Sequence, residues 1–180
     1  ECYGKAVYLV LYLSHQFEQR AVLRYLKSVL SPLDADTCDL VENYVITWGI
    51  RGNALLNTWD KHPDGLGKDW NEHSQKVLEK LNAARELAIA PLGVLKQQFK
   101  NAANLGQQVK ALYAFLEEIS LAKRLQELEE EMETAGEYRE AQILNQLWDI
   151  LLSALEQMYD ALGQTVWEPE IFHRLLTLLL

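Results

Sequence analysis

Apolar residues recur along most of this chain at steps of three and four, the spacing that places side chains on one face of an α-helix. The pattern predicts amphipathic helices over residues 17–30, 36–48, 71–99, 109–119, 121–135 and 141–162. Residues 5–13 are apolar on almost every side, which in a helix indicates a buried, central element. A last helix is expected from Glu168-Pro169, because proline suits the first helical turn.

Several residues predict where these helices begin and end. Ser31-Pro32 should end the first amphipathic helix, since the residue before proline avoids the α region. Asp36 is the expected N-cap of the next helix, and Gly49 is placed to end it in a left-handed conformation. Pro91 lies inside the longest pattern, so we expect a kink or a break near residues 87–91.

Residues 52–70 form the longest stretch without a helical period. They contain the turn signal His62-Pro63-Asp64-Gly65 and several glycines. Loops of this length in compact domains are usually functional or mobile. Because few buried contacts are expected here, we predict that this loop is the most mobile part of the chain.

The composition places the chain in the all-α class. Only 9 glycines and 4 prolines occur in 180 residues, and 49% hydrophobic residues are enough to supply a core. We therefore expect a single helical domain over residues 1–180, an irregular multi-helix bundle that needs no disulfide or metal. The absence of an initial Met and the apolar end Leu178-Leu179-Leu180 suggest a piece of a longer protein.

Several kinds of site are missing from the sequence. No GxxxxGK[ST] or GxGxxG motif occurs, which argues against a nucleotide-binding site. The four histidines lie far apart, which argues against a histidine-based metal or catalytic site, and we expect them at the surface or at helix caps. Cys2 and Cys38 form no ligand cluster and are typical of buried or free thiols in a reducing compartment. The longest apolar run, residues 6–13, is shorter than the ~20 residues of a membrane span. We therefore expect a cytoplasmic chain with no membrane partner.

Charge is distributed unevenly over a chain whose net charge is −9. Residues 117–140 hold nine glutamates and three basic residues, whereas residues 51–100 hold eight basic and six acidic residues. The acidic stretch fits a solvated helix face, and the other interpretation is a surface that repels or docks a partner. The positive balance of residues 51–100 leaves room for a nucleic-acid contact despite the overall charge.

Two sets of basic residues are candidates for contacts with DNA phosphates. Arg20, Arg24 and Lys27 share the outer face of the first amphipathic helix. Such a face is also ordinary for a solvated helix, so both interpretations stay open.

The second set lies in the long loop, where Arg51, Lys61 and Lys68 alternate with Trp59 and Trp70. This mixture could combine phosphate contacts with base stacking. Alternatively, the loop folds back and buries its tryptophans in the core.

Two nearby segments carry a resemblance to a known family. They are Arg24-Tyr25-Leu26-Lys27-Ser28-Val29-Leu30 and the stretch from Asp39 to Gly52, which contains Glu42-Asn43-Tyr44-Val45 and Gly49-Ile50-Arg51-Gly52. Together they resemble the AddB family, the B subunits of bacterial ATP-dependent helicase–nucleases of the AddAB/RexAB type. The likeness continues in residues 87–92, 109–118 and 142–148, so it covers nearly the whole chain. Ser28-Val29 departs from the usual Thr-Gly, and the loop after Gly52 lacks an expected Arg/Trp run.

The resemblance implies an internal helical segment of a larger subunit, similar to the inserted 2B-type subdomain of UvrD-like helicases. In the family, a helicase-like core precedes this region and a nuclease with cluster-binding cysteines follows it. The implied role is a non-catalytic scaffold of the DNA channel in double-strand break repair and recombination. Its implied partners are the rest of the B subunit, the A-type helicase–nuclease subunit and DNA.

The resemblance further implies that the parent complex uses ATP, Mg²⁺ and an iron–sulfur cluster outside this segment, which itself holds no cofactor. By itself the chain is expected to catalyse nothing, because the sequence has no clustered set of titratable residues. The alternative function is a free-standing helical adaptor whose acidic stretch docks protein partners.

Overall fold

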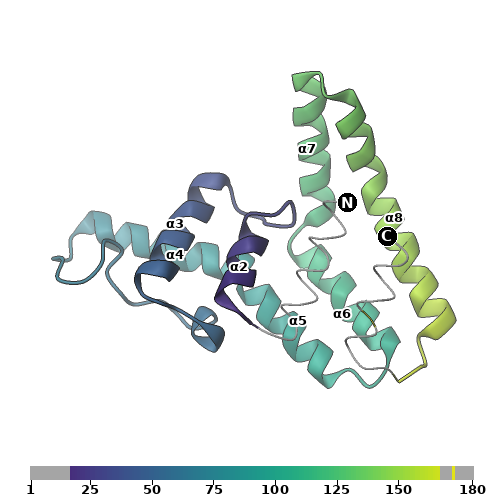
Figure 1. Ribbon diagram of the computed structural model, residues 1–180, viewed down its shortest axis with the longest axis horizontal. Coiled ribbons are helices and arrows are strands. Elements are labelled where there is room, and N and C mark those ends of the chain that lie inside the picture. The colour runs from purple at the N-terminus through teal and green to yellow at the C-terminus, as the bar shows by residue number, and fades with distance from the viewer. Residues whose placement is uncertain (1–16, 167–171, 173–180) are drawn as a thin grey trace.

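The computed structural model describes residues 17–166 and Phe172 (Figure 1). Within these residues the chain forms seven α-helices and one 3₁₀ helix and has no strand, which confirms the all-α prediction. The elements are α2 (Gln19–Leu26), α3 (Ala35–Thr47), the 3₁₀ helix η1 (Gly52–Leu55), α4 (Glu72–Ala88), α5 (Ala90–Asn101), α6 (Leu105–Glu118), α7 (Leu121–Ala135) and α8 (Tyr138–Leu162). The expectations for residues 5–13, for Cys2 and for a helix from Glu168 lie outside the described residues.

Helix α2 is shorter than the apolar pattern predicts. It ends at Leu26, and the Ser28 hydroxyl donates to the Tyr25 carbonyl at 2.7 Å and accepts from the Leu30 N–H at 3.3 Å. A serine that bonds nearby backbone in this way favours a turn over a continued helix. The predicted end at Ser31-Pro32 is therefore wrong by about one turn.

Helix α3 begins two residues before the predicted position. Its N-cap is Asp34, whose carboxylate accepts from the Thr37 N–H at 2.7 Å, while Asp36 lies in the first helical turn. The expectation of Asp36 as N-cap is therefore wrong, because either aspartate fits the sequence rule and only the backbone selects between them. Gly49 follows the helix with φ +59°, as predicted.

Helices α4 and α5 form one long pattern with a break at Ile89, so the expected interruption near Pro91 is confirmed. Pro91 lies in the first turn of α5, where its missing N–H needs no partner. Helix α4 starts with a reciprocal capping box, in which the Asn71 side chain accepts from the Ser74 N–H and the Ser74 hydroxyl accepts from the Asn71 N–H.

Helices α7 and α8 lie at the opposite end of the molecule from α3 and α4, and α6 packs against both of them (Figure 1). Helices α7 and α8 make an antiparallel hairpin. Helix α8 has a seam of apolar residues at steps of three and four, which is buried at Ala141, Leu144, Leu151, Leu155 and Met158. Trp148 and Leu162, the other two seam positions, are half-buried. Backbone bonds from Leu105 N–H and Gly106 N–H to the residues after α8 join the start of α6 to the end of α8.

One hydrophobic cluster extends through all the helices, from Val22 on α2 to Leu155 on α8. Its aromatic members include Tyr25 beside Phe115, with ring centroids 6.4 Å apart, and Phe99, which meets Phe172 edge to face at 5.3 Å. The two ends of the molecule therefore share a core, and the segment from Gly52 to Trp70 lies against its α3–α4 side (Figure 1).

Candidate nucleic-acid interface

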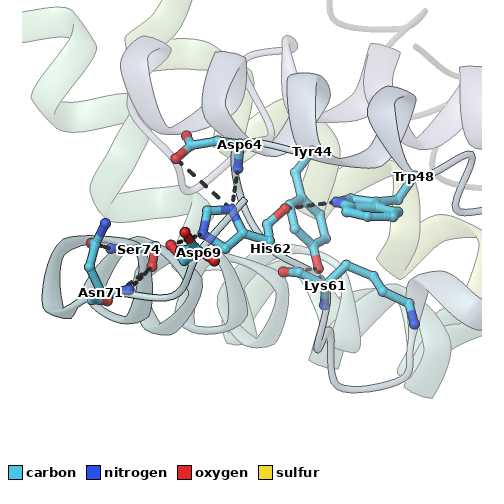
Figure 2. A network of polar contacts seen from close by, with 8 residues as sticks. All are labelled: Tyr44, Trp48, Lys61, His62, Asp64, Asp69, Asn71 and Ser74. Atoms are coloured by element: carbon cyan, nitrogen blue, oxygen red, sulfur yellow. Dashed lines mark hydrogen bonds and ion pairs between the residues drawn. The ribbon is translucent and has the colours of Figure 1, made fainter. Parts of the chain in front are cut away.

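The loop that carries three of the candidate residues is tied to α3 by two aromatic side chains (Figure 2). The Tyr44 hydroxyl donates to the Lys61 carbonyl at 3.1 Å and accepts from the Lys61 N–H at 2.9 Å. The indole N–H of Trp48 donates to the His62 carbonyl at 3.0 Å. Burial raises the pKa of the Tyr44 phenol, so this donor stays protonated.

A buried histidine organises the turn that follows. His62 is only 7% exposed, its Nδ1 accepts from the Asp64 N–H at 3.1 Å, and its Nε2–H donates to the Asp69 carbonyl at 3.2 Å (Figure 2). The ring therefore closes the segment between residues 64 and 69. The expectation that the histidines lie at the surface or at caps is wrong for His62, because its ring replaces a backbone partner inside the turn.

Helix α4 holds the first half of the loop through two polar side chains. The Asn82 amide accepts from the Trp59 N–H and donates to the Trp59 carbonyl, both at 2.9 Å. The Arg85 guanidinium, 3% exposed, donates to the Leu56 carbonyl at 2.8 Å and also contacts Glu86 and Asn82. These contacts hold the loop at Leu56 and Trp59, whereas residues 66–70 are exposed, and the high mobility expected of residues 52–70 stays a prediction.

The two loop tryptophans have different environments. Trp59 is 4% exposed and stacks on Tyr44 with ring centroids 5.1 Å apart, so it belongs to the core and is not available to stack on a base. Trp70 is 48% exposed and lies edge to face with His62 at 4.7 Å. The base-stacking interpretation is therefore wrong for Trp59, and Trp70 alone keeps an accessible ring.

Arg51, Lys61 and Lys68 all have exposed side chains, and neither lysine lines the hollow that lies beside Arg51. Arg51 precedes η1 and lines a shallow hollow of about 430 Å³ together with Arg20 and Glu18 at the start of α2. Lys61 lies 3.8 Å from the Asp60 carboxylate. The structure thus joins one residue from each predicted set, Arg51 and Arg20, across elements 31 positions apart.

The outer face of α2 contains the remaining candidates. Arg24 is exposed at the last turn of the helix. Lys27 contacts the Glu42 carboxylate at 2.5 Å and Asp39 at 3.5 Å, and the Glu42 contact raises the pKa of its ammonium. Since two carboxylates already neutralise Lys27, Arg20 and Arg51 are the stronger phosphate-binding candidates.

Other chemistries find little support in the described part of the chain. Residues 17–166 contain no group of three or more His, Cys, Asp or Glu side chains placed to hold a metal ion. Cys38 is buried, its thiol donates to the Leu26 carbonyl at 2.9 Å, and burial raises its pKa, which is the opposite of an activated nucleophile. None of the helices described has the length and apolarity required to cross a bilayer.

Sequence reasoning missed three residues that shape this surface: His62, Asn82 and Arg85. The turn signal His62-Pro63-Asp64-Gly65 could have indicated a structured turn, because Pro, Asp and Gly each favour turn conformations. Asn82 and Arg85 gave no signal, since polar residues on an amphipathic helix look the same whether they bind water or a distant backbone.

Comparison with known proteins gives a consistent result, although no protein-family profile matches the chain. The B subunit of an ATP-dependent helicase/deoxyribonuclease from Caldanaerobacter subterraneus is 32% identical over 162 residues, which is 88% of this chain and 14% of the relative. The corresponding protein from Clostridium kluyveri is 32% identical over 91% of this chain and 15% of its own length. That from Desulforamulus reducens is 34% identical over 79% of this chain and 13% of its own.

The chain thus spans about one seventh of the length of the curated relatives that it matches. The similarity extends across most of the chain, through both the segments that carry the resemblance and the helices after them. On this evidence the chain belongs to the AddB family, the B subunits of ATP-dependent helicase/deoxyribonucleases.

Proposed function

We propose that this chain is a non-catalytic helical subdomain of a helicase/deoxyribonuclease B subunit that acts in DNA double-strand break repair and recombination. In this proposal it packs on the helicase-like core, as a 2B-type insertion would, and forms part of the wall of the DNA channel. Membership of the AddB family supports the enzyme class. The meeting of Arg20 and Arg51 at one hollow is the observation that carries the DNA contact.

The backbone beside the Arg20–Arg51 hollow is held by hydrogen bonds, which suits a scaffold that contacts DNA. Arg51 is followed by η1, and the residues after η1 are held by Asn82 and Arg85 of α4. Because the backbone around Arg51 is already ordered, a phosphate contact there costs little additional conformational entropy. Contacts of this type position a nucleic acid without reading its sequence.

The catalytic groups of the parent enzyme are proposed to lie in other segments. An iron–sulfur cluster takes four cysteine thiolates, whereas this chain has two cysteines, and Cys38 is engaged in the core. The chain also lacks the glycine-rich motif that holds nucleotide phosphates and Mg²⁺. ATP, Mg²⁺ and the cluster therefore do not fit the residues present here, and no step is assigned to them.

The proposed partners follow from the same family membership. They are the remainder of the B subunit, an A-type helicase–nuclease subunit and, through the assembled complex, DNA in the cytoplasm. The relatives are each named as one subunit of an enzyme, which supports an assembly of more than one chain.

The test uses the two-subunit complex that contains this chain. Arg20→Glu and Arg51→Glu are introduced together, and binding of a forked duplex is titrated at two salt concentrations. We expect weaker binding and a smaller salt dependence, because each lost phosphate contact removes about 0.7 to 0.9 from the slope of log K against log salt. Lys80→Glu with Lys100→Glu, two exposed residues on α4 and α5, is the matched control, because it changes the net charge by the same amount.

A second variant, Lys61→Glu with Lys68→Glu, tests the loop residues separately. Unchanged affinity and slope for the Arg20/Arg51 variant, beside an intact complex, would contradict the proposed DNA contact. Failure of the two-subunit complex to assemble after deletion of residues 17–166 would support the scaffold role, and normal unwinding after that deletion would contradict it.

A further inference from the structure

The α7–α8 hairpin forms an arm that extends away from the α2–α5 half of the molecule (Figure 1). We define the arm as residues 121–150, which are α7, the turn at Gly136 and the first half of α8. Gly136 ends α7 with φ +82°, and the Glu137 N–H donates to the Met132 carbonyl at 2.8 Å. A left-handed glycine with this bond makes a well-defined turn.

The arm carries most of the negative charge of the chain. Residues 121–150 contain eight acidic and three basic side chains, a balance of −5 against −9 for all 180 residues. Three of the eight carboxylates have a side-chain partner within the arm: Glu127 lies 3.6 Å from the Lys123 ammonium, and Glu129 and Glu130 accept from the amides of Asn145 and Gln126 at 2.7 and 3.4 Å. The DNA contact proposed above does not use this surface.

One face of α8 on the arm is apolar and exposed. Ile143 is 50% exposed, Ile150 is 49% exposed, and the half-buried Leu147 lies between them at helical spacing. This Ile143–Ile150 face is distinct from the buried seam, which runs through Ala141, Leu144 and Leu151.

The face continues into a hollow. A shallow depression of about 310 Å³ lies beside Ile150 and is lined by Asp149, Ser153, Ala154 and Gln157. Side chains at positions 143, 147, 150 and 154 share one helix face, which is the arrangement that receives the apolar ridge of another helix.

We infer that the Ile143–Ile150 face docks a basic amphipathic helix of a partner protein. The apolar ridge of such a helix would cover Ile143 and Ile150 and enter the hollow, while its flanking Lys or Arg side chains would meet the acidic arm. The inference does not depend on the proposed DNA role, because it uses a different surface and a ligand of opposite charge.

The charge of the arm disfavours two other occupants of the Ile143–Ile150 face, DNA and a second copy of this chain. DNA is a polyanion, and an arm at −5 repels it. A second copy of this chain would bring two acidic arms together, which costs Coulomb energy that a basic partner would instead gain. A basic helix is the occupant that the apolar face, the net charge of the arm and Asp149 in the hollow all favour.

The test uses a synthetic amphipathic peptide of about 18 residues, with leucines at helical spacing and lysines on both flanks. A matched peptide carries glutamate at each lysine position. Titration calorimetry with the whole chain at about 0.15 M salt is expected to show binding of the lysine peptide and none of the glutamate peptide. Raising the salt to about 0.5 M should weaken this binding several-fold.

Variants locate the binding on the arm. Ile143→Gln with Ile150→Gln should weaken the lysine peptide about tenfold or more, since apolar anchors carry most of such an interface. Val94→Gln, an apolar residue on α5 with a similar exposure of 48%, is the control and should leave the affinity unchanged. Circular dichroism and urea unfolding of each variant check that its fold is intact.

Several results would overturn the inference. Equal binding of both peptides, or equal loss with the Ile143/Ile150 and Val94 variants, would show that the face recognises nothing specific. Concentration-dependent dimerisation that Ile150→Gln abolishes would assign the face to a second copy. Weaker binding of single-stranded DNA by the Ile143/Ile150 variant would assign it to nucleic acid.

Discussion

Asn82 provides hydrogen bonds that a neighbouring strand would supply in a sheet. Its amide pairs with both the N–H and the carbonyl of Trp59, so a segment without regular structure still has satisfied backbone groups where it is buried. The same amide donates to the Leu78 carbonyl at 3.2 Å, and its oxygen receives the Arg85 Nε–H at 3.4 Å. A change at this residue should therefore act on the whole segment.

We expect Asn82→Ala to lower the free energy of unfolding by about 1 to 3 kcal/mol, because two backbone groups of Trp59 lose their partners. Urea unfolding followed by circular dichroism measures the change. Asn145→Ala is the matched control, since Asn145 makes an exposed side-chain bond to Glu129, and it should stay within about 0.5 kcal/mol of the wild type. Equal effects of the two substitutions would show that the bonds between Asn82 and the Trp59 backbone contribute nothing to stability.

Gly106 is the residue at which one added methyl group should matter most. A Cβ there would lie 2.8 Å from the Gly163 carbonyl oxygen and 3.1 Å from a ring carbon of Tyr159. The first contact is with backbone that is held by the Gly106 N–H bond to the same oxygen at 2.9 Å. The methyl group can therefore fit only if the end of α8 moves away from α6.

We expect Gly106→Ala to destabilise the fold by about 1 to 3 kcal/mol, the usual range for overpacking, despite the better helix propensity of alanine. Gly93→Ala is the matched control, because its Cβ would meet only side-chain atoms of Leu56, which can rotate away. Thermal unfolding of both variants should separate them by several degrees. A Gly106→Ala protein as stable as Gly93→Ala would contradict the close approach of α6 and α8.

Elements whose ends depend on local signals could be predicted from the sequence, and those that depend on distant contacts could not. The break at Pro91 and the glycine after α3 follow from backbone preferences alone. The bonds that hold Leu56, Trp59 and Lys61 could not be predicted, because they come from Tyr44 of α3 and from Asn82 and Arg85 of α4. The sequence predicted which basic residues could contact DNA. That Arg20 and Arg51 line the same hollow could be seen only in the tertiary structure.

Asp34, the N-cap of α3, makes the stability of the fold depend on pH. The Thr37 N–H lowers the pKa of its carboxyl below the ordinary value, so the native state favours the ionised form. A lowered native pKa stabilises the fold fully above the unfolded-state pKa, and that contribution is lost as the pH falls through the native value.

We therefore expect the stability of the wild type to fall relative to that of Asp34→Asn as the pH is lowered from about 6 to about 3. The side-chain oxygen of asparagine can still cap the helix, but it does not titrate. Urea midpoints of the two proteins across this range measure the difference. A difference independent of pH would show that the Thr37 contact does not act through the ionised carboxylate.

At the scale of the whole molecule, the acidic side chains and the candidate phosphate-binding arginines lie on different elements. The acidic arm of α7 and α8 lies apart from the α2–η1 region that holds Arg20 and Arg51 (Figure 1). Of the six basic candidates, Lys27 is paired with two carboxylates and Lys61 lies near one. The number of phosphates that this chain can neutralise by itself is therefore small.

Because the isolated chain can neutralise few phosphates, we expect it to bind DNA weakly. With few phosphate contacts and a net charge of −9, we expect a Kd no lower than about 10⁻⁴ M at physiological salt, in the non-specific range. Fluorescence anisotropy with a labelled forked oligonucleotide measures it, and the Arg20/Arg51 double reversal should remove what binding remains. Submicromolar binding by the wild-type chain would show that the charges converge more strongly than the hollow beside Arg51 indicates, and would make this segment a DNA-binding module without the rest of the subunit.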